Sequence, residues 1–171
     1  MRTRSLAVVA ALLLISAVCV QAAETAHANI VDSTGKSVGT ATLKQTSAGV
    51  EIKASLSNLP PGTHGMHIHA VGKCDAPDFK SAGGHFNPDM KKHGMNNPDG
   101  MHAGDLPNIE VGADGKAKVK VTAAHVTLTS GDHSLFHDGG TSLVIHEKAD
   151  DYMTDPSGNS GNRIACGVIE K

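Results

Sequence analysis

Apolar and polar residues alternate along most of this 171-residue chain, and no stretch after residue 22 has the three-to-four-residue spacing of a long amphipathic helix. The stretch 50–56 is the cleanest example, because its four apolar residues share one face of an extended chain. Turn signals rich in glycine, proline and aspartate separate the runs. The expected strands cover residues 26–31, 50–56, 109–111, 117–121, 125–128, 143–145 and 164–169. The pattern predicts an all-β fold, either an antiparallel β-sandwich or a flattened barrel.

Two long polar segments, 70–107 and 147–162, interrupt this pattern, and the first contains three histidines. Structureless loops of this length are uncommon in compact domains and are usually functional. Because they hold too little apolar surface to order themselves by burial, we expect metal ligands and an anchor at Cys74 to hold them on the β scaffold.

Residues 1–22 have the three parts of a secretory signal peptide. Arg2 and Arg4 precede an apolar run at 6–18, and Ala22 is a small residue at the expected cleavage point. The apolar run is shorter than a membrane-spanning helix needs. We therefore expect this segment to be cleaved.

The cysteines agree with export. Cys19 lies in the signal segment, and the bulky Val18 before it argues against a lipid anchor, so we expect no membrane anchor. The domain at 23–171 then retains Cys74 and Cys166, and an oxidising compartment favours a disulfide between them over two buried free thiols. Removing the two signal arginines changes the formal charge from −2 to about −4, and we expect no nucleic-acid partner.

Histidines are concentrated in one part of the chain, which has eleven of them and no tryptophan. Neutral imidazole is the commonest metal ligand in proteins, and it suits copper and zinc. Six histidines and one aspartate form the cluster: His64, His67, His69, His85, His93, His102 and Asp105. The cluster predicts two metal ions bound close together.

Strand geometry groups three of the candidate ligands. His67 and His69 are two residues apart, so they point to the same face of a strand while their neighbours face the core. His146 ends another expected strand. Three imidazoles that converge from two strands predict a rigid metal site.

The other candidates lie on the first long loop. His93, His102 and Asp105 would form a tetrahedral zinc site together with a shared fourth ligand. His85 lies between the two groups in the sequence and is the candidate for sharing.

The chain resembles the copper/zinc superoxide dismutases of the bacterial periplasmic kind over essentially all of 23–171. The matching stretches are 65–69, 84–88, 92–94, 102–106, 144–151 and 161–169. The resemblance implies a Greek-key, flattened barrel of eight antiparallel strands with two long functional loops. It also implies a periplasmic location and superoxide as the substrate.

Carried over by position, the resemblance implies copper on His67, His69, His85 and His146, and zinc on His85, His93, His102 and Asp105. Each subunit would hold one ion of each metal, with His85 as the bridge between them. The family's redox-cycling copper converts superoxide to dioxygen and hydrogen peroxide, while zinc is structural. His85 is expected to gain a proton and return it during the cycle.

Three further features follow from the resemblance. Asp150 matches the carboxylate that links a copper-bound histidine to a zinc-bound one. Arg163 matches the arginine that attracts the anion, and so joins His85 as a catalytic residue. The pair Cys74 and Cys166 matches the disulfide that ties the first long loop to the barrel.

Two alternatives remain open. A periplasmic metal-binding or metal-delivery protein on the same fold would be expected to lose a ligand or the arginine, and this chain retains them all. A purely structural sandwich leaves the histidines unexplained. The stretch 152–162 also lacks the lysine-containing guidance group of eukaryotic members, so guidance of the anion is expected from Lys73, Lys80 or Lys148. The resemblance carries over no dimer interface and leaves a homodimer open.

Overall fold

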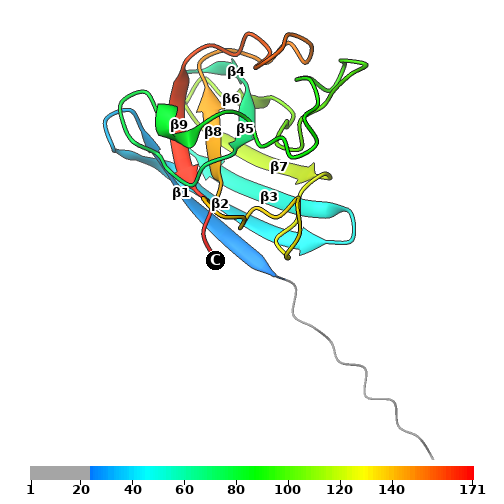
Figure 1. Ribbon diagram of the computed structural model, residues 1–171. Coiled ribbons are helices and arrows are strands. Elements are labelled where there is room, and N and C mark those ends of the chain that lie inside the picture. Colours follow the sequence, from blue (N-terminus) through cyan, green and yellow to red (C-terminus); the bar gives the residue numbers. More distant parts are fainter. Residues whose placement is uncertain (1–23) are drawn as a thin grey trace, which may run out of the picture.

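The computed structural model describes residues 24–171, so the predicted signal segment at 1–22 lies outside the described residues. Within the described part, antiparallel strands dominate and the one helix is a single 3-10 turn, η1 (Lys80–Ala82), which confirms the all-β prediction (Figure 1). The strands are β1 (Thr25–Asp32), β2 (Ser37–Thr46), β3 (Gly49–Leu56), β4 (Gly62–His64), β5 (Met66–His69), β6 (Ile109–Val111), β7 (Ala117–Ala123), β8 (Ser142–His146) and β9 (Arg163–Val168). Over residues 24–171 no helix has the length and apolar character that a bilayer crossing needs.

The strands form a curled antiparallel half-barrel. Seven of them form one sheet in the order β5-β8-β9-β1-β2-β3-β7, and β4 pairs with β6. Only Gly65 separates β4 from β5, so one extended segment pairs with β6 through its first half and with β8 through its second half. β3 pairs with β7, not with the strand that follows it in the chain, which is a Greek-key connection. Figure 1 shows β1, β2, β3 and β7 as one wall, with β9, β8 and β5 curling over it.

The core lies between these walls and follows the predicted alternation. In β1, Ala26, Ala28 and Ile30 are buried between exposed polar residues, and the four apolar residues of β3 are buried in the same way. Their burial provides the main stabilisation of the barrel, at roughly 25 cal/mol per Å² of apolar surface removed from water.

Strand β2 escaped the pattern analysis because its alternation is interrupted. The pairing of β1 with β2 shifts register between Ile30 and Val31. Gly39 lies at this irregularity with φ +150°, and a side chain there would collide with the backbone carbonyl of Ser55. The bulge changes which face each residue of β2 presents. The strand expected at 125–128 is wrong, since that stretch makes only an isolated bridge.

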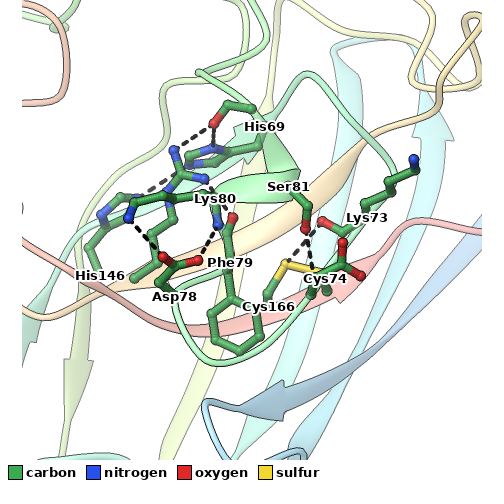
Figure 2. Close-up of a disulfide and its surroundings, with 12 residues drawn as sticks. His69, Lys73, Cys74, Asp78, Phe79, Lys80, Ser81, His146 and Cys166 are labelled. Carbon is green, nitrogen blue, oxygen red and sulfur yellow. Dashed lines mark hydrogen bonds and ion pairs between the residues drawn. A yellow bond between two sulfur atoms is a disulfide. The ribbon is translucent and has the colours of Figure 1, made fainter.

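The two long polar segments are loops, as predicted, apart from the short turn η1. A disulfide joins Cys74 in the first loop to Cys166 in β9, which confirms the predicted pair. Phe79 is fully buried beside it and packs with Val144 of β8. Figure 2 shows the Phe79 ring next to the bridge, with His69 and His146 on the other side of the same loop. The disulfide and this small apolar cluster therefore fix the first loop against the barrel.

Candidate metal centre

Three imidazoles meet where β5 and β8 lie side by side. His67 and His69 come from β5 and His146 from the end of β8, where the pairing with β9 shifts register. The neighbours Met66 and Ile68 are fully buried in the core. Because side chains alternate along a strand, both histidines point to the opposite face, toward the loops. The structure thus places these three rings together on the outer face of the β5–β8 pair, away from the apolar core.

A fourth ring joins them from the first long loop. His85 pairs with His69 through an isolated β-bridge, which carries the loop back along the strand. One donor nitrogen from each of four rings lies within 4.8 Å of all the others: His67, His69, His85 and His146. This is the set of four on which the family resemblance implies copper.

In His69 and His146, a hydrogen bond to one ring nitrogen determines that the other nitrogen faces the group of four. His69 Nδ1 donates to the carbonyl of Gly83 at 2.9 Å, and His146 Nδ1 donates to that of Gly161 at 3.3 Å. Their Nε2 atoms then face each other at 3.3 Å, with lone pairs available to a shared partner. Acceptors of this kind orient metal-binding imidazoles and raise their basicity.

Two further nitrogens of the group have no partner. His67 Nδ1 and His85 Nε2 are buried and make no hydrogen bond within the described residues. Leaving a buried polar atom unpaired costs about 1–3 kcal/mol, so a ligand that binds these two nitrogens would stabilise the arrangement. A soft or borderline cation with a preference for nitrogen ligands fits these lone pairs, which makes the donor set suitable for copper.

A second donor set is organised around Asp105. Its Oδ2 atom accepts hydrogen bonds from the backbone N–H groups of Gly94 (2.9 Å) and His102 (3.0 Å), which fixes the carboxylate. Its Oδ1 atom faces three Nδ1 atoms, those of His85 at 2.9 Å, His93 at 3.0 Å and His102 at 3.3 Å. Three imidazole nitrogens and one carboxylate oxygen are four donors of the kinds that tetrahedral zinc accepts.

His102 lies at the edge of this second set. A group of four that meets the same distance criterion as the first set consists of His67, His85, His93 and Asp105, whose donor atoms lie within 4.8 Å of one another. His67, however, uses its Nε2 atom on Asp150 at 2.6 Å, whereas His102 Nδ1 faces both Asp105 Oδ1 and His85 Nδ1 at 3.3 Å. His102 therefore remains the candidate for the fourth zinc ligand.

Asp150 connects the two donor sets from behind. Its Oδ2 atom accepts from His67 Nε2 at 2.6 Å, and its Oδ1 atom accepts from His93 Nε2 at 3.0 Å. The carboxylate is 3 % exposed. The backbone of Gly158 covers it, and a Cβ at that position would collide with Asp150 Oδ1. The structure thus places Asp150 where the resemblance expects it.

Burial keeps the copper-side imidazoles neutral. Desolvation lowers the pKa of His85 and of His146 to about 4, and it also lowers the pKa of His67 and His69. A neutral imidazole at pH 7 has the lone pair that a metal needs.

The zinc side behaves differently. Burial lowers the pKa of His93, but hydrogen bonds to Asp105 and Asp150 outweigh it and raise that pKa to about 9. Burial also opposes the charge on Asp105 and Asp150, yet their imidazole partners hold the pKa of both carboxyls far below the usual range. Both carboxylates are therefore anionic at neutral pH and ready to balance a cation.

Arg163, at the start of β9, lies over the mouth of the copper-side group. It lines a groove of about 400 Å³ together with His69, His85 and His146. Its guanidinium donates to the carbonyls of Phe79 and Gly83, both at 2.6 Å. Burial lowers the pKa of the Arg163 guanidinium, but an arginine remains charged at any physiological pH. The groove thus leads from solvent, past a fixed positive charge, to the imidazoles.

Several positioning residues were missed by sequence reasoning. Asn108 joins the two long loops, because its amide donates to the carbonyl of Asp150 and accepts from its N–H, both at 2.9 Å. Asp155 accepts from the backbone N–H of His93 at 2.8 Å. Neither residue has a spacing that could reveal these contacts. His64, a member of the predicted cluster that belongs to neither donor set, is buried and bonded to the carbonyls of Pro60 and His146.

Comparison with known proteins gives one consistent answer. A family model described as copper/zinc superoxide dismutase (SODC) matches residues 37–169. A Cu-Zn superoxide dismutase 1 of Aquifex aeolicus (strain VF5) is 56% identical over 146 residues, which are 84% of this chain and 86% of the relative.

Solved structures agree with this match. A SOD-like protein from Bacillus subtilis is 49% identical, with a TM-score of 0.81, over 83% of this chain and 96% of its own. A Cu/Zn superoxide dismutase from Brucella abortus is 33% identical, with a TM-score of 0.70, over 86% of this chain and 100% of its own.

Proposed function

Because this chain belongs to the copper/zinc superoxide dismutase family and its enzymes disproportionate superoxide, we propose that His85 is the shared ligand through which its two metal sites work together. The observation that carries the proposal is the position of one ring between two donor sets. His85 Nε2 is buried and unpartnered beside the copper-side imidazoles, while its Nδ1 lies 2.9 Å from Asp105 Oδ1. A ring that has lost both protons offers one lone pair to each side.

The two donor sets divide the chemistry. Copper would be held by His67, His69, His85 and His146, and zinc by His85, His93, His102 and Asp105. When bound, copper supplies one-electron oxidation and reduction, and zinc supplies a fixed positive charge without redox chemistry. Asp150 keeps the rings of His67 and His93 in the orientation that this division requires.

The residues of the chain supply binding and a proton. Arg163 binds the small anion at the inner end of the groove, since its guanidinium is held rigidly by two carbonyls and faces the imidazoles. His85 holds a proton at Nε2 in one half of the cycle and gives it to the reduced product in the other half. Hydrogen peroxide takes two protons, and solvent in the groove supplies the second.

Two of the expected lysines flank this groove. Lys80 lines an adjoining groove of about 540 Å³ that also contains Arg163. Its ammonium group lies 2.8 Å from Asp78, which cancels part of its long-range attraction (Figure 2). Lys148 lies next to Gly161, at the rim of the copper-side groove. We propose that Arg163 with these two lysines provides the local positive potential that a net-negative protein needs to attract an anion.

We propose in addition that residues 1–22 direct export, that 23–171 form the mature domain, and that the protein works in the periplasm. The signal-like pattern of residues 1–22 and the disulfide between Cys74 and Cys166 support this, since disulfides persist in oxidising compartments. A homodimer remains an alternative to a monomer, and sedimentation at two protein concentrations distinguishes them.

The test of the shared ligand uses its effect on two unpaired spins. Protein loaded with copper in both sites should show a strongly reduced electron paramagnetic resonance signal, because one imidazole couples the two Cu(II) ions. The His85→Gln variant, loaded in the same way, should regain two independent signals and lose dismutase activity. A double-copper wild type with two uncoupled signals would refute the bridge. Bound metals without superoxide turnover would favour the metal-delivery alternative.

A further inference from the structure

The outer face of β2, β3 and β7 has an unusual distribution of charge. Its outward positions carry four lysines, Lys44, Lys53, Lys118 and Lys120, and a single acidic residue, Glu51. All four lysines are exposed. The chain as a whole is net negative, at −2, so this face concentrates positive charge on an otherwise acidic protein. We call the four lysines the lysine stripe.

Strand register shows that the lysine stripe runs in a line. Lys44 of β2 lies opposite Glu51 of β3. In the next row Thr42 lies opposite Lys53, which lies opposite Lys120 of β7, and in the third row Thr40 lies opposite Ser55, which lies opposite Lys118. Lys44, Lys53 and Lys118 therefore form a diagonal that advances by one strand and two residues at each step. Diagonal neighbours on one face of a sheet are about 7–8 Å apart. Lys120 stands beside Lys53 and doubles the charge at the middle of the line.

This arrangement costs the free protein some stability. Lys53 and Lys120 are directly opposite each other, and like charges in that position are unfavourable. Glu51 offsets only part of the repulsion, with one oxygen 2.8 Å from Lys53 and the other 3.4 Å from Lys120. Lys44 and Lys118 have no acidic partner within salt-bridge distance among the described residues. A ligand with several negative charges would relieve the repulsion.

The lysine stripe borders two adjoining grooves. One, of about 380 Å³, is lined by Lys44 and Lys53, and the other, of about 310 Å³, by Lys53, Lys118 and Lys120. Both grooves include Thr42 and Lys53, so they form one path across the strands.

The groove floors carry the hydroxyl groups of Thr40, Thr42 and Ser55. Among the described residues these hydroxyls make no side-chain hydrogen bond to protein. They are free to pair with hydroxyl groups of a ligand.

We propose that the lysine stripe binds a linear acidic polysaccharide, a chain of sugars with a carboxylate at regular intervals. Carboxylates would pair with the successive lysines, and sugar hydroxyls would bond to the threonine and serine hydroxyls between them. A bilayer fits less well, because the exposed large apolar side chains of the described part are Met90, Met95 and Met153, none of which is on this face. Single-stranded nucleic acid would need aromatic stacking platforms, and this face has none.

Binding there leaves the metal centre accessible. None of the four lysines lines the copper-side groove or the adjoining groove at Arg163. The core of the barrel separates the outer face of β2 and β3 from the histidines of β5 and β8. The enzyme would thus remain active while attached to a polymer, and the proposal does not depend on the shared role of His85.

The test uses the metal-loaded protein and polygalacturonate as the probe, with neutral dextran as the comparison polymer. Lys53→Gln with Lys118→Gln removes two charges from the lysine stripe. Lys36→Gln with Lys91→Gln removes the same charge from exposed residues elsewhere and is the matched control. Superoxide consumption, which should be equal in all three proteins, shows that each is folded.

Wild type should bind polygalacturonate at low salt, lose affinity as salt rises, and ignore dextran. The stripe variant should bind about tenfold more weakly, as expected for two exposed ion pairs, and the control should stay within about twofold of wild type. Equal weakening of both variants, or no binding by wild type, would overturn the proposal. A third result would also overturn it: wild type binds vesicles of anionic lipid but not polygalacturonate, and the stripe variant no longer binds the vesicles. That result would assign the face to a membrane.

Discussion

Asp150 offers the sharpest test of how the two metal sites are organised. Replacing it by asparagine keeps the size of the side chain and one oxygen atom but removes the charge. In the structure its two oxygens accept from His67 Nε2 at 2.6 Å and His93 Nε2 at 3.0 Å, and Oδ1 also accepts from the N–H of Tyr152 at 2.7 Å. An amide nitrogen cannot accept, so Asp150→Asn must lose at least one of the two imidazole bonds.

The magnitude follows from the kind of bond that is lost. A hydrogen bond to a charged group contributes about 1.5–3 kcal/mol, against about 1 kcal/mol for a neutral one. Loss of the outer partner of a metal-binding histidine typically weakens metal affinity 10- to 100-fold, or about 1.4–2.7 kcal/mol. Because His67 belongs to the copper set and His93 to the zinc set, we expect the affinities for both metals to fall within this range.

The assay is competition of copper, and separately of zinc, against a chromophoric chelator at neutral pH. Asp151→Asn is the matched control, because Asp151 is the adjacent residue, accepts hydrogen bonds from Thr154 and Asn159 of its own loop, and contacts no histidine. A metal affinity of Asp150→Asn within threefold of wild type would refute the reasoning. An equal loss in Asp151→Asn would show that loop order, and not the imidazole bonds, sets the affinity.

Further predictions concern the other parts of the site. Gly158→Ala should lower metal affinity, because Gly158 has a φ of +63° and a Cβ there would collide with Asp150. The control Gly35→Ala has a φ of +81° but lies in open space, so it should change only the free energy of unfolding, by about 1 kcal/mol. Chelator competition distinguishes the two variants. Cys74→Ser should lower the free energy of unfolding by up to about 4–5 kcal/mol, because the disulfide closes a chain segment of 92 residues. Denaturant titration measures this loss, and wild type with and without reductant provides the control. Arg163→Ala should slow superoxide consumption and flatten its dependence on salt, and an unchanged salt dependence would remove its guiding role. In metal-free protein, the pKa of about 4 of His85 and His146 should make the free energy of unfolding fall as pH drops from about 6.5 to 4, by up to about 3 kcal/mol for each ring. The stability contributed by His93, whose pKa is raised to about 9, is present below about pH 6.5 and is lost as pH rises toward 9. A pH series of unfolding midpoints that stays flat from 7 to 4 would contradict the first expectation.

Residue periodicity was sufficient for the part of the site that lies on strands. His67 and His69 share a face because strand side chains alternate, and their buried neighbours determine which face that is. The same alternation located most of the barrel. It failed at β2, where the bulge at Gly39 shifts the pattern by one residue, and such a shift depends on contacts with the neighbouring strands.

Periodicity could not place the residues on loops. The residue types on the loop predicted a zinc site shared through His85, and the family resemblance assigned its ligands by position. Nothing in the spacing of His85, His93 and His102 shows that their Nδ1 atoms face one oxygen of Asp105. The role of Asn108 had no signal at all. It depends on two segments about forty positions apart lying against each other, with the backbone of one bonded to a side chain of the other.

The anchoring of Arg163 makes catalysis depend on the oxidation state of the two cysteines. The two carbonyls that hold its guanidinium, from Phe79 and Gly83, belong to the segment that Cys74 fastens to the barrel. In a newly made chain with free thiols, the three imidazoles on β5 and β8 would already be together, but this segment would be held only by the apolar cluster around Phe79 and the guanidinium would be fixed less firmly. Under the export proposed above, full turnover would therefore begin only after this cysteine pair is oxidised outside the compartment of synthesis.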